Sequence, residues 1–381
     1  MNDSSISRKI ASAMPFFEED DITVILKDVK QILEAKRLVL GPYTKNLEKK
    51  FGEYVGTKYA VAVSSCSAAL EIVLKYCNVK NHEVIVPTNT FIACPNSIIY
   101  SGGKPVFSDI DPKTFCMDFN DIKKKITQKT KAIMVVHLSG QPQPDMDSLR
   151  ELCDKKGIFL IEDASHAHGA KIGGKKVGSL SLAGCFSFFA TKILSTGTGG
   201  IITTDDPELQ IFAEAMRHQG GIGGEGQIES FDKFGFDWMM SEITAALGLN
   251  QLSKLDKQIK KRQSIANYYY QKIDNKSIQL LPPIENTTNV FWKFITILDE
   301  KIDRNSVRSE LRKSYNIDAG ILYPVLCHLQ PIYKDLGHRE GECPVAEKFI
   351  KHQLTLPINP FMNEDDVDYV VNSLNKVITR N

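Results

Sequence analysis

The sequence is poor in the features that mark secreted, disulfide-bonded or membrane-spanning proteins. Its eight cysteines form no CxxC pair and are scattered through apolar stretches, a distribution typical of reduced thiols in the cytosol. No apolar run approaches the length of a membrane span, and the first residues contain no apolar core of a secretion signal. We therefore expect a cytoplasmic protein with no membrane partner.

An excess of charge of one sign is also lacking. The chain has 47 lysines and arginines against 46 aspartates and glutamates, with no long block of either sign. The basic stretch from Lys123 to Lys131 is typical of a solvated face. The composition therefore gives no reason to expect nucleic acid as a partner, whereas small anions remain possible ligands of local sites.

What the sequence does contain is a repeated alternation of short apolar runs with segments of helix length. The apolar runs are residues 59–63, 83–87, 105–109, 132–136 and 158–161. Short β-branched runs of this kind, separated by helices, are typical of a mostly parallel sheet that is covered on both faces. We expect an α/β fold whose ligand site lies at the carboxyl ends of strands.

The length of the chain indicates two domains, because 381 residues exceed what one hydrophobic core usually supports. Residues 20–40 and 243–259 carry apolar positions at helical spacing, and a new strand is expected over residues 290–298. We place a large domain at residues 1–255 and a small C-terminal domain at residues 256–381.

One lysine and one aspartate occupy places suited to a cofactor. Lys192 follows an apolar run with three phenylalanines and precedes a turn rich in glycine and threonine, and a strand upstream ends in Asp163. Burial would favour the neutral, nucleophilic amine, and a carboxylate beside a pyridine nitrogen would keep that nitrogen protonated. The pair predicts a pyridoxal phosphate site, although a lone lysine is commonly exposed and a lone aspartate commonly caps a helix.

Donors for a phosphate and a partner for a ring are also present. The strand at residues 59–63 is followed by small hydroxyl residues and a helix start, whose free backbone N–H groups suit an anion. Ser187 is a second candidate donor, and Phe91 is a candidate for stacking on the ring. Each of these features also has an ordinary structural explanation. The hydroxyl residues after the strand could simply cap the helix, Ser187 could bond to the backbone, and Phe91 could pack in the core.

Two other patterns argue against other cofactors. His166 and His168 have no third ligand at suitable spacing, so a metal site is not indicated. Gly197, Gly199 and Gly200 do not stand in the order strand, GxGxxG, helix, so they form no dinucleotide fingerprint.

Together the motifs resemble those of the DegT/DnrJ/EryC1/StrS family of sugar aminotransferases, which are pyridoxal phosphate enzymes. The resemblance runs nearly end to end. It is carried by residues 41–42, 47–51, 64–70, 86–91, 103–109, 136–141, 162–169, 216–220, 235–242, 323–328 and 356–357. It implies the aspartate aminotransferase type I fold, with a mostly parallel seven-stranded sheet flanked by helices in the large domain and a smaller C-terminal α/β domain.

The resemblance also implies a role for each candidate residue. Lys192 would hold the cofactor as a Schiff base and move the proton of the reacting carbon. The other cofactor contacts would be Asp163 at the pyridine nitrogen, His166 at the phenolic oxygen, Phe91 over the ring, and Ser187, Cys66 and Ser67 at the phosphate. Relatives with a histidine in place of the lysine dehydrate keto sugars, so Lys192 implies a transaminase.

The sequence departs from the family pattern in three places. Cys66 and Ser67 stand where the family usually has Gly-Thr, and Cys66 limits how closely the chain approaches a phosphate. Asp237 replaces an asparagine that reaches the partner subunit's phosphate, which an aspartate would repel. Met239 replaces an arginine that could bind a donor carboxylate or a substrate phosphate. The change at Met239 bears on the choice of substrate and not on the cofactor.

The implied function is transfer of an amino group from glutamate to the ketone of a nucleotide-linked deoxy sugar, for amino sugars of surface polysaccharides or glycoconjugates. The enzyme would be a homodimer with shared active sites, to which the neighbour supplies residues 220–241. Tyr323, His328 and Asp237 are weaker candidates for sugar contacts, and the first two could equally pack between domains. Two alternatives remain: a transaminase for a free keto sugar or cyclitol, and a non-catalytic regulator with the same fold.

Overall fold

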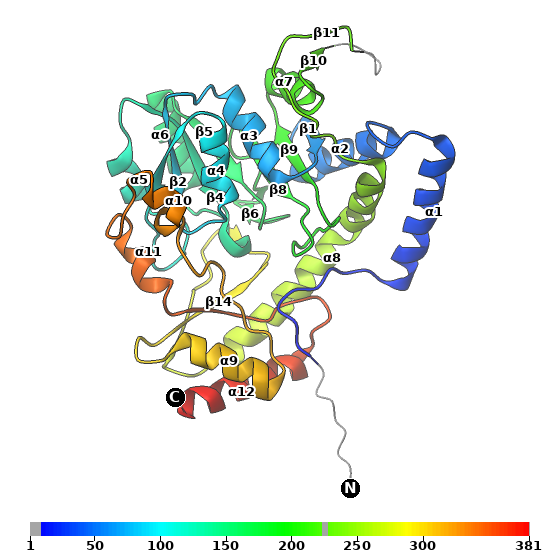
Figure 1. Cartoon of the computed structure of the whole chain (residues 1–381). Helices are drawn as coiled ribbons and strands as arrows, with labels where there is room; N and C mark the ends of the chain where they lie inside the picture. Colours follow the sequence, from blue (N-terminus) through cyan, green and yellow to red (C-terminus); the bar gives the residue numbers. More distant parts are fainter. Residues whose placement is uncertain (1–8, 223–227, 381) are drawn as a thin grey trace.

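The computed structural model describes residues 9–222 and 228–380 and has a seven-stranded sheet at its centre (Figure 1). In spatial order the strands are β1 (Tyr59–Val63), β9 (Gly200–Thr204), β8 (Ala183–Ser187), β5 (Phe159–Asp163), β4 (Thr130–Val136), β2 (Glu83–Pro87) and β3 (Lys104–Ser108). Strand β9 is antiparallel to β1 and β8, and the other neighbours are parallel. The predicted α/β fold with a mostly parallel sheet is confirmed; the reversal of β9 is not evident from the sequence.

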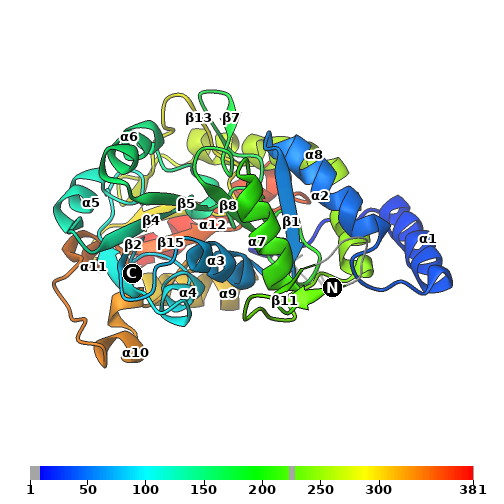
Figure 2. The same ribbon diagram turned by 90° about the horizontal axis from the view of Figure 1, so that it is seen from above.

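Helices cover both faces of this sheet (Figure 2). One face carries α3 (Cys66–Tyr76), α4 (Ala93–Tyr100) and α7 (Pro207–Arg217), and the other carries α2 (Pro42–Val55), α5 (Phe119–Lys125), α6 (Met146–Lys156) and α8 (Glu242–Lys272). The alternation of side chains along β2 explains both layers, because Val84 and Val86 enter the first core cluster and Ile85 the second. A further helix, α1 (Glu19–Ala35), lies against α8. Within the described part of the chain, no helix is both long and apolar enough to cross a bilayer.

A second core surrounds a smaller antiparallel sheet. Its strands are β12 (Ile278–Leu280), β14 (Phe294–Leu298) and β15 (Gln353–Leu356), and α9 (Arg304–Tyr315) and α12 (Glu364–Arg380) pack on them. The strand expected over residues 290–298 occupies only the second half of that range. The backbone of Phe291 has a positive φ of 49°, which interrupts the extended conformation ahead of β14.

The predicted domain boundary at residue 255 falls inside α8, which passes unbroken from one core to the other (Figure 1). On this helix Ile259 still belongs to the core beneath the large sheet, and Ile265 belongs to the small core. Three later elements return to the large domain, namely η2 (Cys327–Leu329), α10 (Pro331–Lys334) and α11 (Pro344–Phe349). The division at residue 255 therefore stays a prediction, because α8 crosses it and three later elements pack against the core of the large domain.

Several short elements complete the described chain. They are η1 (Leu138–Gly140), the ribbon of β6 (Lys171–Ile172), β7 (Lys175–Lys176) and β13 (Thr287–Thr288), and the pair β10 (Gly221–Ile222) and β11 (Ser230–Phe231).

A buried carboxylate joins the start of α2 to the start of α8. The side chain of Glu242 accepts hydrogen bonds from the backbone N–H groups of Gly41 at 2.9 Å, Tyr43 at 2.8 Å and Thr44 at 2.9 Å. It also accepts a hydrogen bond from the hydroxyl group of Thr44. Helix α2 has no side-chain cap of its own, so Glu242 satisfies the N–H groups that every helix leaves free at its N-terminus.

We expect Glu242→Ala to lower the free energy of unfolding by about 3 kcal/mol, because it leaves several buried donors without an acceptor. Glu242→Gln should fall between this variant and the parent, since one carbonyl oxygen remains. Urea unfolding followed by far-UV circular dichroism measures the loss. The control is Glu151→Ala on α6, whose side chain is exposed and makes a long ion pair at 4.0 Å. Equal stability of the Glu242 and Glu151 variants would contradict the anchoring role.

Candidate active site

The ends of two adjacent parallel strands bring the predicted cofactor residues together. Asp163 is the last residue of β5 and pairs in register with Cys185 of β8. Strand β8 ends at Ser187, and Lys192 lies in the loop that leads from there to β9. The first residue of β9, Gly200, returns to pair with Ser187, so this loop begins and ends at the same edge of the sheet.

The amine of Lys192 lies in a half-buried position above an aromatic ring. Its Nζ is 4.2 Å from the centre of the Trp292 ring. Burial lowers the pKa of Lys192 to about 8, and the negative charge of Asp163 acts in the opposite direction. Far more of this amine is therefore uncharged near neutral pH than in an exposed lysine, as nucleophilic attack requires.

The carboxylate of Asp163 is buried and fixed by two donors. Its Oδ1 accepts the backbone N–H of Ser165 at 2.9 Å, and its Oδ2 accepts the thiol of Cys94 at 2.9 Å. Because a carboxylate oxygen has two lone pairs, Oδ2 can still accept a second hydrogen bond. The residue thus suits the pyridine nitrogen of a cofactor.

The neighbouring Glu162 holds the strand end in place. It is fully buried, and its oxygens accept the N–H groups of Gly178 at 2.7 Å and Leu180 at 2.8 Å. His137 donates to it from Nε2 at 2.9 Å, since Nδ1 of that histidine already accepts the N–H of Gln143 at 3.0 Å. These bonds tie β5 to the loop before β8.

His166 is a neutral donor at the same site. Burial, followed by the charge of Lys192, lowers the pKa of His166 well below its usual value. Its Nδ1 accepts the N–H of Ser139 at 3.3 Å, so we assign the ring proton to Nε2, which lies 3.3 Å from the hydroxyl of Tyr323. The imidazole stacks on Trp292 with 3.9 Å between ring centres. An N–H and a hydroxyl are therefore available to a phenolic oxygen.

The start of α3 offers backbone donors to a phosphate. Ser65 caps the helix through Ala68 N–H at 3.2 Å, so the amides of Cys66 and Ser67 remain unbonded within the first turn. Burial raises the pKa of the Cys66 thiol well above its usual value, so the thiol is uncharged and does not repel an anion. A Cβ on Gly200 would lie 2.6 Å from the amide nitrogen of Cys66, so only glycine lets β9 approach the helix start so closely.

Ser187 and Phe91 lie at the edges of this arrangement. Ser187 is buried, and its Oγ accepts the N–H of Phe189 at 3.3 Å, which leaves the hydroxyl proton free to donate. The side chain of Phe91 is 59% exposed ahead of α4, as stacking on a ligand ring requires. The amine, carboxylate, neutral imidazole and helix start together match the chemical groups of pyridoxal phosphate, so the residues present fit this cofactor.

The three weaker candidates are placed very differently. The hydroxyl of Tyr323 reaches His166, whereas His328 is fully buried, with Nδ1 2.5 Å from the Thr88 hydroxyl and Nε2 2.9 Å from Glu347. Both nitrogens of His328 are thus bonded within the chain, and this packing between domains gives the predicted sugar contact no support. Asp237 is exposed; residues 223–227 of its stretch lie outside the described residues.

Backbone contacts place the segment around Asp237 close to α3 of the same chain. The carbonyl of Trp238 accepts the N–H of Ser64 at 2.7 Å, just before the helix start. The side chain of Met239 is half-buried next to it.

Sequence reasoning missed the residue on which the site rests, Trp292. Its ring lies beneath Lys192 and against His166, and its Nε1 donates to the carbonyl of Thr191 at 2.7 Å. The apolar run around it predicts a strand, and no signal in the sequence separates Trp292 from its neighbours. The next residue, Lys293, was missed for the same reason.

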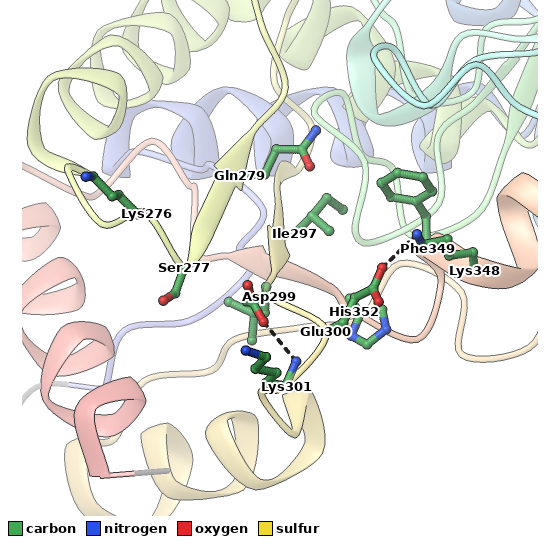
Figure 3. Close-up of a pocket in the computed structure, with 11 residues that line it drawn as sticks. Lys276, Ser277, Gln279, Ile297, Asp299, Glu300, Lys301, Lys348, Phe349 and His352 are labelled. Carbon is green, nitrogen blue, oxygen red and sulfur yellow. Dashed lines mark hydrogen bonds and ion pairs between the residues drawn. The ribbon is translucent and has the colours of Figure 1, made fainter.

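A separate hollow lies in the small domain, away from this site. A hollow of about 490 Å³ lies beside β12 and β14 in the small domain, lined by mixed charges such as Lys348 and Glu300, and contains none of the predicted site residues (Figure 3). In the described ranges, no group of three histidine, cysteine, aspartate or glutamate side chains is arranged to hold a metal ion.

Comparison with known proteins agrees with this geometry. Residues 19–375 match the model of the DegT/DnrJ/EryC1/StrS aminotransferase family. The chain is 34% identical over 338 residues to GDP-perosamine synthase of Escherichia coli O157:H7, across 88% of this chain and 90% of that protein. It is 35% identical over 354 residues to dTDP-3-amino-3,6-dideoxy-alpha-D-galactopyranose transaminase of Aneurinibacillus thermoaerophilus, across 92% and 94% of the two proteins.

A solved structure gives the same result. Helicobacter pylori PseC, an aminotransferase involved in the biosynthesis of pseudoaminic acid, superposes with a TM-score of 0.91 at 26% identity, over 98% of this chain and 100% of that one. The chain therefore belongs to the DegT/DnrJ/EryC1/StrS family and is a pyridoxal phosphate-dependent aminotransferase.

Proposed function

We propose that this enzyme transfers an amino group from glutamate to the keto group of a nucleotide-linked deoxy sugar, as a step toward amino sugars of surface polysaccharides or glycoconjugates. The observation that carries the proposal is a half-buried Lys192 amine whose pKa responds to the charge of Asp163, in a chain whose relatives are named for nucleotide-linked amino sugars. One relative is named for a GDP-linked sugar and another for a dTDP-linked sugar, and the two are 34% and 35% identical to this chain. Sequence identity alone therefore does not indicate which nucleotide the substrate carries.

When bound, pyridoxal phosphate stabilises negative charge on the carbon next to the transferred nitrogen. The amine of Lys192 would attach the cofactor and, when free, would take up and return the proton of that carbon at Nζ. A lysine with a pKa of about 8 can both take up and return this proton near neutral pH. The ring of Trp292 covers one side of that amine.

The other residues orient the cofactor. Asp163, whose carboxylate is held by Ser165 and Cys94, would accept the ring N–H and keep the nitrogen protonated. His166 would donate from Nε2 to the phenolic oxygen. The backbone at Cys66 and Ser67 and the hydroxyl of Ser187 would hold the phosphate.

We further propose a homodimer in the cytoplasm. On α1, Leu26 and Leu33 are 63% and 56% exposed, and in the β10–β11 segment Phe231 and Phe234 are 64% and 99% exposed. Both regions project from the body of the chain (Figure 1). Exposed apolar side chains of this number are typical of a surface covered by a partner, and eight unpaired cysteines agree with a reducing compartment.

The reactivity of Lys192 is expected to follow its pKa. The rate at which cofactor-free enzyme gains the visible absorption band with pyridoxal phosphate should rise with pH and level off above about 8, because the neutral amine reacts. Asp163→Asn should move this midpoint to lower pH, since the charge of Asp163 raises the pKa of Lys192. Lys192→Ala should give no borohydride-stable adduct, whereas the exposed control Lys155→Ala should behave like the parent. A parent protein that gains no band would overturn the cofactor site.

The substrate is tested with a panel of keto sugars and glutamate. We expect turnover of a GDP- or dTDP-linked keto deoxy sugar, and at least about a thousandfold loss in Lys192→Ala, because nucleophile and proton carrier are lost together. Mass spectrometry of the product measures the exchange of oxygen for nitrogen. Turnover of free keto sugars or cyclitols alone would favour the first alternative function. A Lys192→Ala protein that keeps its cellular role would favour a regulator.

The dimer is tested by sedimentation. The 42.6 kDa chain should sediment at about twice that mass. Phe234→Asp and Leu26→Asp should each shift it toward the monomer, because a charge would be buried at the contact. The matched control is Ile332→Asp on α10, which is 54% exposed outside the proposed contact. A monomeric parent enzyme would contradict the shared active site.

A further inference from the structure

A second lysine, which no function described above uses, lies beside the reactive one. Lys293 follows Trp292 directly, and its Nζ lies 5.2 Å from the centre of the Trp292 ring, against 4.2 Å for Nζ of Lys192. Its backbone N–H donates to the carbonyl of Ser139 at 3.3 Å, and Ser139 in turn binds His166. The two amines therefore approach one ring at the centre of the candidate site.

The ammonium group of Lys293 lacks a strong partner. Its Nζ makes one long hydrogen bond, to the carbonyl of Ser12 at 3.4 Å. Within residues 9–222 and 228–380, no carboxylate lies at ion-pair distance from it. Asp318 acts on it from farther away and receives the hydroxyl of Ser12 at 3.3 Å.

The surroundings of this ammonium are otherwise positive. Burial lowers the pKa of Lys293 to about 8, with contributions from the charges of Arg262 and Lys192, while Asp318 opposes them. Arg262 donates from Nη1 to the carbonyls of Phe291 and Ile358, while its buried Nε has no hydrogen-bond partner within the described residues. A half-buried cation among cations is costly to maintain without a counter-ion, so the site favours an anion.

Two anions come near this site in the proposed reaction, namely a carboxylate of the donor and the diphosphate of the sugar nucleotide. By the family resemblance, Met239 stands where an arginine could bind either of them, and its side chain carries no charge. The carboxylate nearest the amino group of a donor is attached to the reacting carbon itself, so it lies within a few ångströms of the position of the Lys192 amine. The diphosphate of a sugar nucleotide is farther from the keto carbon, because ring atoms separate them.

We propose that Lys293 binds the carboxylate attached to the reacting carbon of the amino donor, and so replaces the cation that Met239 does not supply. This inference rests on the proposed function, since it assumes an amino acid as donor. Lys293 is thereby a binding residue for the first half of the reaction, in which the donor gives up its amino group, and has no part in binding the keto sugar.

The test compares Lys293→Met, which keeps the length of the side chain without its charge, with Lys293→Arg. Single-turnover absorbance of the holoenzyme should show at least about tenfold weaker apparent affinity for glutamate in Lys293→Met, with recovery in Lys293→Arg. Glutamine, which keeps only the carboxylate on the reacting carbon, should lose affinity by the same factor. Lys276→Met, an exposed lysine of the small domain, is the control.

A second readout does not depend on turnover. Glutarate, an unreactive dicarboxylate, should quench the fluorescence of Trp292 in a Trp238→Phe background and bind at least about tenfold more weakly to Lys293→Met. Equal glutarate affinity in both proteins would overturn the inference, as would a rise in KM for the sugar nucleotide alone. If the parent took no amino group from glutamate, the proposed donor would fail, and the glutarate titration would still decide the role of Lys293.

Discussion

The buried carboxylate of Asp163 and the half-buried amine of Lys192 lie at the same edge of the sheet, and the rest of the site depends on that pair. The carboxylate of Asp163 accepts hydrogen bonds from a backbone N–H and a thiol, and its charge offsets part of the burial that lowers the pKa of Lys192. Removing the charge of Asp163 would therefore lower the proton affinity of the Lys192 amine. The parallel pairing of β5 with β8 maintains their relation, and Glu162 fixes the end of β5.

The reversal of β9 links the amine to the phosphate position. Because β9 runs back along β8, the loop that carries Lys192 must return to the same sheet edge. Gly200 then lies against the start of α3, where a Cβ would collide with the backbone of Ser65 and Cys66. One glycine therefore fixes the distance between the two parts of the site that hold opposite ends of the cofactor.

The sequence predicts those features that local patterns encode. Strands β1 and β2 occur at the residues expected, because their apolar runs and flanking polar residues mark both ends. Lys192 and Asp163 were predicted because each directly follows such a run. The place of Trp292 depends on a hydrogen bond across 101 residues, and the burial of His328 depends on Thr88, 240 residues away. Contacts at such separations leave no periodic trace, so only the folded chain reveals them.

Helix α8 has a mechanical consequence for the enzyme. With 31 residues it is about 46 Å long, and it is buried at one end under the large sheet and at the other, through Tyr269, in the small core. An unbroken helix is stiff along its axis, so the two cores cannot swing apart at residue 255. Any change in the relative position of the two cores must therefore bend this helix and cannot occur as a simple rotation about residue 255.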